Sequence, residues 1–451
     1  MNYLKIYEKK TKSSKELYNK LKKIIPGGVS HNIRYYPPYP IFVEKCEGSK
    51  IFDIDGNEYI DLWMGHYSHI LGHNSNVVKE AIDKIKLTGN HSGCVNPYEY
   101  KHAEIIKRLV PGVESLKFCA SGTEATTYAI RLSRAFTKKD IVLKIAGGWH
   151  GAGSELTKAI KFPYTSKSSS GIPQELLNKT DYIFFNNIDK SYEIIKKYKN
   201  NIACIILEPV IGEGGFLPAN REFLIFLRDI TGELGSILIF DEIITGFRIS
   251  SGGAQKKFQI IPDLTTMGKI AGGGFNIGII GGKKEILDIS GATFNGENKV
   301  LIGGGTFSET HYSSIAGYSV LNFLSNNEKI YNELDLKGEY VRKNIKEYIE
   351  KNQINAVVTG TSSLYMIHFP YKFNDSILTP QDIGEKTDLK KREYEFKVRL
   401  LNEGIHVMHG GGAISYAHSY KDLDTIIEKT VKVLNEMNLQ KSWFLYITIL
   451  K

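Results

Sequence analysis

The chain has 451 residues, of which 42% are hydrophobic and 24% are charged. This composition predicts a folded protein with a large apolar core and excludes a disordered or fibrous chain. Lysine and arginine number 58 against 49 aspartates and glutamates, and the basic residues are spread along the chain. We therefore expect an anionic small-molecule ligand or substrate rather than a nucleic-acid partner.

The four cysteines, Cys46, Cys94, Cys119 and Cys204, are far apart and lack the spacing of a metal site. We expect reduced thiols and no bound metal. The N-terminus lacks the basic head and apolar core of a secretory signal. No run approaches the roughly 18 apolar residues of a membrane-spanning helix, so no membrane partner is predicted. These features favour the cytoplasm as the location.

The expected elements follow a regular order along the chain. A basic N-terminal helix comes first, followed by a short hairpin over 41–60 that turns at Asp55-Gly56-Asn57. Apolar runs then alternate with helical periodicity through the middle of the chain. From about 325 onward, a helix rich in Glu, Lys and Tyr precedes a strand at 364–369. The expected central strands are 115–120, 140–146, 182–185, 202–207, 236–240 and 277–280, and the expected helices are 124–136, 191–198 and 221–231.

Strands that are apolar on both faces and joined by helices indicate an α/β fold, with a mostly parallel central sheet covered by helices on both faces. We expect residues 73–324 to form this large domain. The N-terminal segment 1–72 is expected to join residues 325–451 in a smaller α+β domain. Ligands of such sheets bind beyond the carboxyl ends of the strands, so candidate site residues are sought there.

Ser121, Gly122 and Thr123 lie between an expected strand and an expected apolar helix. Free backbone N–H groups and the helix dipole converge at such a junction and favour an anion such as a phosphate. An ordinary helix cap is the alternative interpretation. The patterns GxGxxG and GxxxxGK[ST] do not occur at this strand end, so neither a dinucleotide site nor a P-loop is predicted.

Asp241 and Lys269 are the two candidate reactive groups. Asp241 ends an apolar strand, where its carboxylate can hold a proton on a heteroaromatic nitrogen, because such a charge pair is worth roughly 4 kcal/mol at an effective dielectric of about 20. A helix cap or a metal ligand are the alternatives for this residue. Lys269 lies among the small and apolar residues of 265–274, where burial disfavours the ammonium and leaves an amine that can attack an aldehyde.

Taken together, these residues supply an anion site, an aromatic ring at Trp149, a carboxylate and an amine, in that chain order. Pyridoxal phosphate requires each of them: for its phosphate, its ring face, its pyridine nitrogen and its aldehyde. The sequence resembles the class III aminotransferases of the type I pyridoxal-phosphate fold, and within them the glutamate-1-semialdehyde aminomutase subgroup. The motifs that carry this resemblance extend over nearly the whole chain: 25–29, 58–61, 70–73, 121–125, 149–151, 208–210, 240–248, 268–269, 305–306 and 416–419.

The resemblance implies a role for each matched residue. Lys269 would form an aldimine with pyridoxal 5'-phosphate and then move the substrate proton, while Asp241 would keep the pyridine nitrogen protonated. Thr306 would reach the phosphate from the neighbouring subunit of a homodimer with shared active sites. The other implied cofactor-binding residues are Ser121, Gly122 and Thr123 at the phosphate, Trp149 and Ile243 on the two ring faces, and His150 and Glu208 nearby.

Two of these positions carry specific qualifications. Trp149 stands where the family usually has a tyrosine, so ring stacking is retained and a phenolic hydrogen bond is lost. Ile243 is equally explained as an ordinary core residue.

Arg34 corresponds to the substrate-side arginine of the family, and its guanidinium matches a substrate carboxylate. A surface arginine is the alternative for Arg34.

The substrate side departs from the subgroup's pattern over 62–69, 307–311 and 408–413, the last replacing a stretch that carries a pocket glutamate. We therefore predict an aminotransferase of this subgroup, which moves an amino group between an amino donor and a keto or aldehyde acceptor. The alternative is the aminomutase reaction, an intramolecular transfer that gives 5-aminolevulinate. Segment 161–172 lies where the family has a mobile loop, and it is either a lid or an ordinary connection.

Overall fold

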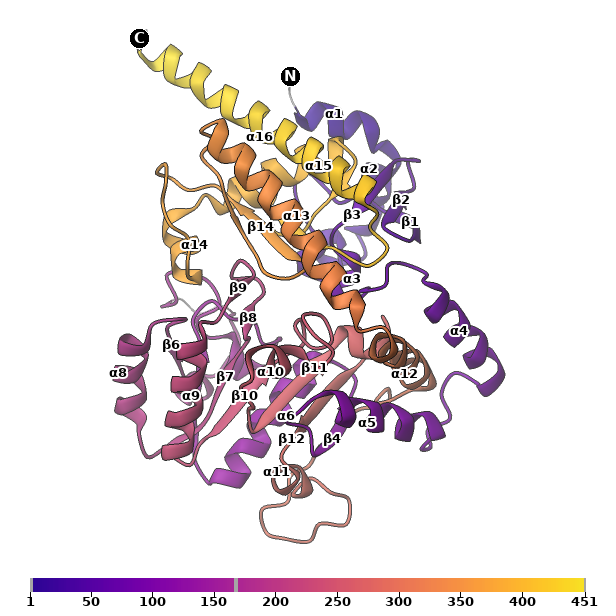
Figure 1. Cartoon of the computed structure of the whole chain (residues 1–451), viewed down its shortest axis with the longest axis vertical. Coiled ribbons are helices and arrows are strands. Elements are labelled where there is room, and N and C mark those ends of the chain that lie inside the picture. The colour runs from indigo at the N-terminus through magenta and orange to yellow at the C-terminus, as the bar shows by residue number, and fades with distance from the viewer. Residues whose placement is uncertain (1–2, 166–168, 450–451) are drawn as a thin grey trace.

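The computed structural model describes residues 3–165 and 169–449, and it describes side chains only as far as residue 439. Residues 166–168 of the expected loop 161–172 therefore lie outside the described residues. Figure 1 shows a large sheet with its helices in the lower half of the view and a second group of helices and smaller sheets above it. Both chain ends lie in the upper group.

A seven-stranded sheet forms the centre of the lower group. Five neighbouring strands run parallel, and one strand, β12, runs antiparallel between β11 and β4. The expectation of a mostly parallel α/β sheet is therefore confirmed. In sheet order the strands are β4 (Ser115–Cys119), β12 (Gly278–Gly282), β11 (Leu264–Gly268), β10 (Ile237–Asp241), β7 (Ile202–Leu207), β5 (Ile141–Ile145) and β6 (Thr180–Ile183).

Helices cover both faces of this sheet because the central strands are apolar on both sides. All six residues of β7 are buried, and alternate residues point to opposite faces. Cys204 and Ile206 pack in one core cluster with helix α6 (Gly122–Thr137). Ile205 and Leu207 pack in another with helix α9 (Arg221–Glu233). The sheet is thus the middle layer of three.

The two ends of the chain meet in the upper group. Strand β3 (Glu58–Asp61) pairs in parallel with β15 (Ile405–His406), so that Ile60 lies beside Ile405. A second small sheet contains β13 (Val357–Thr359), β14 (Leu364–His368) and β16 (Gly411–Ala413). The domain boundaries at 72 and 324 stay a prediction, although this pairing brings the ends together as that prediction requires.

Two buried charged side chains fix the connections between these parts. Asp61 accepts hydrogen bonds from the backbone N–H groups of Trp63 and Met64 and contacts His73 and His406 at 2.8 and 2.7 Å. Arg248 is fully buried and donates to the carbonyl oxygen of Tyr67 at 2.6 Å and to Ser363 Oγ at 3.2 Å. The segment after β3 is therefore held near its start by Asp61 and at Tyr67 by Arg248.

The structure also differs from the sequence expectations in detail. Strand β11 was not expected, because Thr265 and Thr266 interrupt its apolar character. The strand expected at 182–185 lies two residues earlier, at Thr180–Ile183. The expected single N-terminal helix is divided at Thr11, whose hydroxyl bonds back to the carbonyl of Tyr7.

The hairpin expected over 41–60 is three strands, β1 (Val43–Glu47), β2 (Lys50–Asp53) and β3, with the expected turn between the last two. The remaining strands form the short pair β8 (Val210–Ile211) and β9 (Leu217–Pro218). The other helices are α1 (Tyr3–Lys10), α2 (Lys12–Leu21), α4 (Asn76–Thr88), α5 (Pro97–Leu109), α7 (Gln174–Asn178), α8 (Ile188–Tyr198), α10 (Gly253–Phe258), α11 (Lys284–Asp288), α12 (His311–Asn326), α13 (Lys329–Lys351), α14 (Pro380–Lys386), α15 (Lys397–Asn402) and α16 (Tyr420–Ile449). Within the part of the chain that the structure describes, no helix combines the length and apolar character needed to cross a membrane.

Close backbone approach at Gly278 gives a test of this packing. A Cβ atom there would overlap the carbonyl oxygen of Ser121, which belongs to the neighbouring strand end. We expect Gly278→Ala to lower the free energy of unfolding by about 1–3 kcal/mol, measured by urea denaturation. Gly232→Ala is the matched control, since a Cβ on that helical glycine meets nothing within 4 Å, and it should be neutral or slightly stabilising. Equal effects of the two changes would contradict the packing argument.

Candidate active site

The loop between β4 and α6 has the geometry of a helix N-terminus that is open to a ligand. Ser121 is the N-cap residue and its side chain accepts the N–H of Glu124 at 3.2 Å. The Glu124 carboxylate accepts the N–H of Ala120 at 2.8 Å, which fixes the loop. Gly122 and Thr123 start the helix, where the first N–H groups have no partners within the helix itself.

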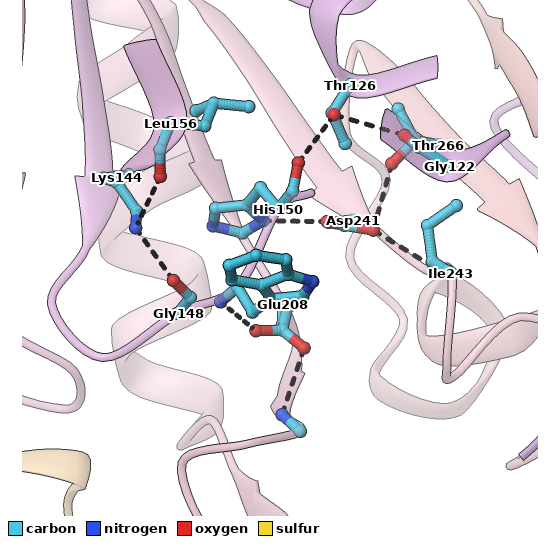
Figure 2. A network of polar contacts seen from close by, with 12 residues as sticks. Gly122, Thr126, Lys144, Gly148, His150, Leu156, Glu208, Asp241, Ile243 and Thr266 are labelled. Carbon is cyan, nitrogen blue, oxygen red and sulfur yellow. Dashed lines mark hydrogen bonds and ion pairs between the residues drawn. The ribbon is translucent and has the colours of Figure 1, made fainter. Parts of the chain in front are cut away.

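Asp241 ends β10 and is buried, and three donors surround its carboxylate. His150 Nδ1 lies 2.8 Å from one oxygen, while the Thr266 hydroxyl and the backbone N–H of Ile243 lie 3.1 and 3.2 Å from the other. Figure 2 shows these contacts converging on Asp241. The Asp241 charge is thus stabilised away from bulk water.

Lys269 is the first residue after β11 and has a left-handed backbone, with φ of +49°. Among the described residues, none forms a hydrogen bond or an ion pair with its amine. Burial lowers the pKa of Lys269, and the charges of Asp241 and Glu208 act in the opposite direction. The amine therefore lies near both carboxyl groups and loses its proton more readily than an exposed lysine does.

Glu208 follows β7 and is also buried. Its carboxyl oxygens accept the backbone N–H groups of Trp149 at 2.9 Å and Gly212 at 3.0 Å. Burial and the nearby charge of Asp241 raise the pKa of Glu208. Glu208, at the end of β7, thus holds the loop that follows the neighbouring strand β5 and contains Trp149.

The aromatic and apolar candidates are placed around these groups. A Cβ on Gly122 would lie 3.0 Å from Ile243 Cδ1, and one on Gly268 would lie 3.2 Å from the same atom. Ile243 is therefore packed between the Ser121 loop and the residue before Lys269. The side chain of Trp149 is 38% exposed, whereas that of His150 is 1% exposed.

A histidine-rich region forms the other side of Lys269. Burial lowers the pKa of His66 to about 4, with further contributions from the positive charges of His31, Lys269, Arg34 and His409. Arg34 is exposed, and it lies close enough to act on His66 together with Lys269. The structure therefore places Arg34 near the candidate site.

A left-handed turn positions His66. Met64, Gly65, His66 and Tyr67 have φ values of 47°, 59°, 58° and 68°, a conformation that costs non-glycine residues about 1–2 kcal/mol each. The turn, labelled α3 (Met64–Tyr67), is held by the contacts of Asp61 and Arg248 described above. The ring of His66 lies 4.2 Å from the ring of Trp63.

Two further polar residues of the site were missed by sequence reasoning. Thr266 was considered only as one of the small and apolar neighbours of Lys269, and the register of β10 and β11, which pairs it with Asp241, shows its role. Glu213 acts by its charge on Lys269, His31 and Lys144. The available sequence signal for Glu213 was that it is an acidic residue in the glycine-rich stretch after Glu208.

Among the described residues, Thr306 has no hydrogen bond to the candidate site residues. It is exposed and follows Gly303–Gly305, and no hydrogen bond of the described residues links it to Lys269 or Asp241. A contribution from a neighbouring subunit stays a prediction.

A site for a phosphorylated aldehyde cofactor needs a carboxylate near an amine, an open helix N-terminus and an aromatic side chain. The residues described above supply these parts. Residues 32–434 match the family Aminotransferase class-III, and the chain belongs to this family. A glutamate-1-semialdehyde 2,1-aminomutase of Methanosphaera stadtmanae is 40% identical over 92% of this chain and 96% of its own length. The protein of the same description from Methanobrevibacter smithii is 38% identical over 95% and 99%.

A solved structure described as a transaminase with PLP bound has a TM-score of 0.87 and 26% identity, and the match covers 95% of this chain and 99% of that one. The architecture is therefore that of the type I transaminases, as expected. The main expectation from the sequence was intermolecular amino transfer, with the aminomutase reaction as the alternative. The named relatives favour the aminomutase alternative.

The electrostatics of the site predict the effect of Asp241→Asn. The Asp241 charge raises the pKa of both Lys269 and His150, so its removal should lower both values. The measurements are NMR titration of the His150 ring and the pH dependence of Lys269 acylation. Asp263→Asn is the control, because Asp263 is buried at the other end of the same sheet and pairs with Arg228 and Lys283. Unchanged titrations in Asp241→Asn would contradict the assignment.

Proposed function

We propose that the protein is a glutamate-1-semialdehyde 2,1-aminomutase, which moves an amino group between adjacent carbons of one substrate and forms 5-aminolevulinate. The observation that carries this proposal is the full-length similarity to proteins of that description, combined with the Asp241 and Lys269 geometry. The coarser conclusion, an enzyme of the class III pyridoxal-phosphate family, follows from family membership.

The residues present fit the cofactor. The buried Asp241 carboxylate has three donors already in place, and the Lys269 amine has no protein partner among the described residues. We assign Ser121, Gly122 and Thr123 to the phosphate. Bound pyridoxal phosphate supplies an aldehyde that joins to amines and a ring that accepts electrons from the adjacent carbon.

The protein's own contribution is to bind, orient and move a proton. Asp241 holds a proton on the ring nitrogen, because its charge favours a neighbouring cation. The Lys269 amine, with a pKa lowered by burial, takes a proton from one substrate carbon and returns it to another atom. Trp149 and Ile243 are the residues that would hold the two ring faces of the cofactor, which would limit the orientation of the bound substrate.

Arg34 is assigned to the substrate carboxylate, and a homodimer with Thr306 reaching the partner's site is part of the proposal. His66, whose ring is affected by the charges of both Lys269 and Arg34, is held neutral by a pKa that burial lowers to about 4. A neutral ring adds no charge that would compete with Arg34 for the carboxylate.

An intermolecular aminotransferase is the second candidate. The residues that favour it are those of the substrate side, 62–69 and 408–413, which depart from the mutase pattern. In this region Glu393 lies 3.0 Å from His409.

A single-substrate experiment decides between the two reactions. Glutamate-1-semialdehyde alone, without another amine or carbonyl compound, should be converted over many turnovers per active site, because the amino group never leaves the enzyme. Product is measured as 5-aminolevulinate, with Lys269→Ala as the inactive control. A reaction that stops after one equivalent and resumes on addition of a second substrate would instead identify an aminotransferase.

The Arg34 assignment predicts a change in KM. Arg34→Ala should raise the KM for a carboxylated substrate by about 10- to 150-fold, since hydrogen bonds to charged groups are worth about 1.5–3 kcal/mol. Arg34→Lys, which retains charge and loses the paired geometry, should give an intermediate value. The cofactor absorbance should be the same in all three proteins. An unchanged KM in Arg34→Ala would remove Arg34 from the substrate site.

A further inference from the structure

Lys144 is a buried lysine that the proposed reaction does not use. It lies in the middle of β5, and its side chain is fully buried. Its amine donates to the carbonyl oxygens of Gly148, Lys158 and Leu156 at 2.8, 2.9 and 3.2 Å. An ammonium has three donors, so these carbonyls use all of them. Figure 2 shows the Gly148 and Leu156 contacts of Lys144 at the left of the view, beside His150.

The bond to Gly148 and a bond to Glu208 act on the same peptide group. The C=O of this peptide belongs to Gly148 and accepts from Lys144, while its N–H belongs to Trp149 and donates to Glu208 at 2.9 Å. A cation and a carboxyl group therefore hold the two ends of one peptide plane. Hydrogen bonds arranged in this way strengthen each other in a low-dielectric interior.

This peptide group directly precedes the side chains that matter for the site. Trp149 follows the held C=O, and His150, one residue later, contacts Asp241 at 2.8 Å. A third bond, from the Thr126 hydroxyl to the carbonyl of His150, holds the other end of this short segment at 2.8 Å. Movement at Gly148 would therefore change the position of both rings.

A buried cation is a costly way to anchor a loop. Taking an ammonium out of water carries a penalty of several kcal/mol, which well-packed apolar side chains avoid. Among the described residues, no carboxylate forms an ion pair with Lys144. The charges of Glu208 and Glu213 stabilise it from a greater distance.

We propose that Lys144 is a positioning residue of the active site, whose ammonium fixes the Gly148–Trp149 peptide and thereby the rings of Trp149 and His150. Loss of its proton removes one of three hydrogen bonds and loosens this segment. The proposal rests on the proposed function only in treating Trp149 and His150 as active-site residues, and its test does not use turnover.

The protonation state of Lys144 gives the proposal a measurable signature. Burial lowers the pKa of Lys144 to about 7, against the opposing charges of Glu208 and Glu213. Glu208, whose pKa is raised to about 8, and His150, whose pKa is lowered by burial, are the other groups near it with shifted pKa values. The ammonium is thus intact below pH 7 and is lost as the pH rises. Because the folded-state pKa is lower than that of the unfolded chain, this proton loss does not reduce the free energy of unfolding. Loosening of the segment is therefore distinct from unfolding.

The experiment is ¹⁹F NMR of the holoenzyme labelled with 5-fluorotryptophan, with the Trp149 resonance assigned by Trp149→Phe. Hydrogen exchange of residues 147–158 is measured on the same samples. Lys144→Met removes the ammonium and keeps an apolar side chain of similar length. Lys139→Met is the matched control, because Lys139 also donates to two carbonyls, those of Leu234 and Gly235, in a loop that carries no site residue.

In the wild type and in Lys139→Met, we expect the Trp149 resonance to shift with a midpoint near pH 7. In Lys144→Met this transition should be absent, and at pH 6 residues 147–158 should exchange at least about tenfold faster, as expected for loss of a hydrogen bond to a charged group. A retained transition, or unchanged exchange, would overturn the proposal.

Glu208→Gln provides a second arm that does not depend on the recovery of Lys144→Met. The Glu208 charge raises the pKa of Lys144, so its removal should move the Trp149 midpoint to lower pH. A transition that disappears in Glu208→Gln would assign the titration to Glu208 itself and overturn the proposal. A midpoint that does not move would overturn it as well.

Discussion

Four neighbouring parallel strands each bring one ionisable side chain to the candidate site, and the site depends on how these groups compensate one another. Lys144 comes from β5, Glu208 from the end of β7, Asp241 from the end of β10 and Lys269 from the end of β11. Two cations and two acids are thus arranged along one edge of the sheet. Burial disfavours each charge alone, and Lys144, Glu208 and Asp241 are each held in place by hydrogen bonds to a neighbouring strand or loop, whereas the Lys269 amine has no such partner among the described residues.

The cofactor side of the site was predictable from the sequence because it depends on strand ends. Asp241 ends an apolar run, and parallel strands bring such residues to one edge. Lys269 was recognised instead from its small and apolar neighbours, because the strand before it was not predicted. Lys144 could not be recognised in this way, because a lysine in an apolar run looks like an interruption rather than a contact. Its three acceptors come from a loop whose path no local pattern specifies. Thr266 was hidden for a related reason, since its partner is defined by strand register.

The substrate side was less predictable because it is assembled from distant segments. His66 depends on a left-handed turn that contacts from Asp61 and Arg248 help to stabilise against its backbone preference. Arg34 is brought close to His66 from an exposed segment. Thr306, in the proposed homodimer, would reach a site on a second chain, so its role depends on assembly rather than on local sequence. The general chemistry of the site therefore follows from local sequence, whereas the choice of substrate follows from long-range packing.

The pairing of β3 with β15 also has a consequence for synthesis on the ribosome. One edge of β3 pairs early with β2, but its other edge finds β15 only when positions 405 and 406 have left the exit tunnel. The strands of the seven-stranded sheet are all available once residue 282 has been made. Contacts between such distant positions close slowly. The nascent chain should therefore leave the side chain of Ile60, which packs against C-terminal residues in the folded protein, exposed during most of translation.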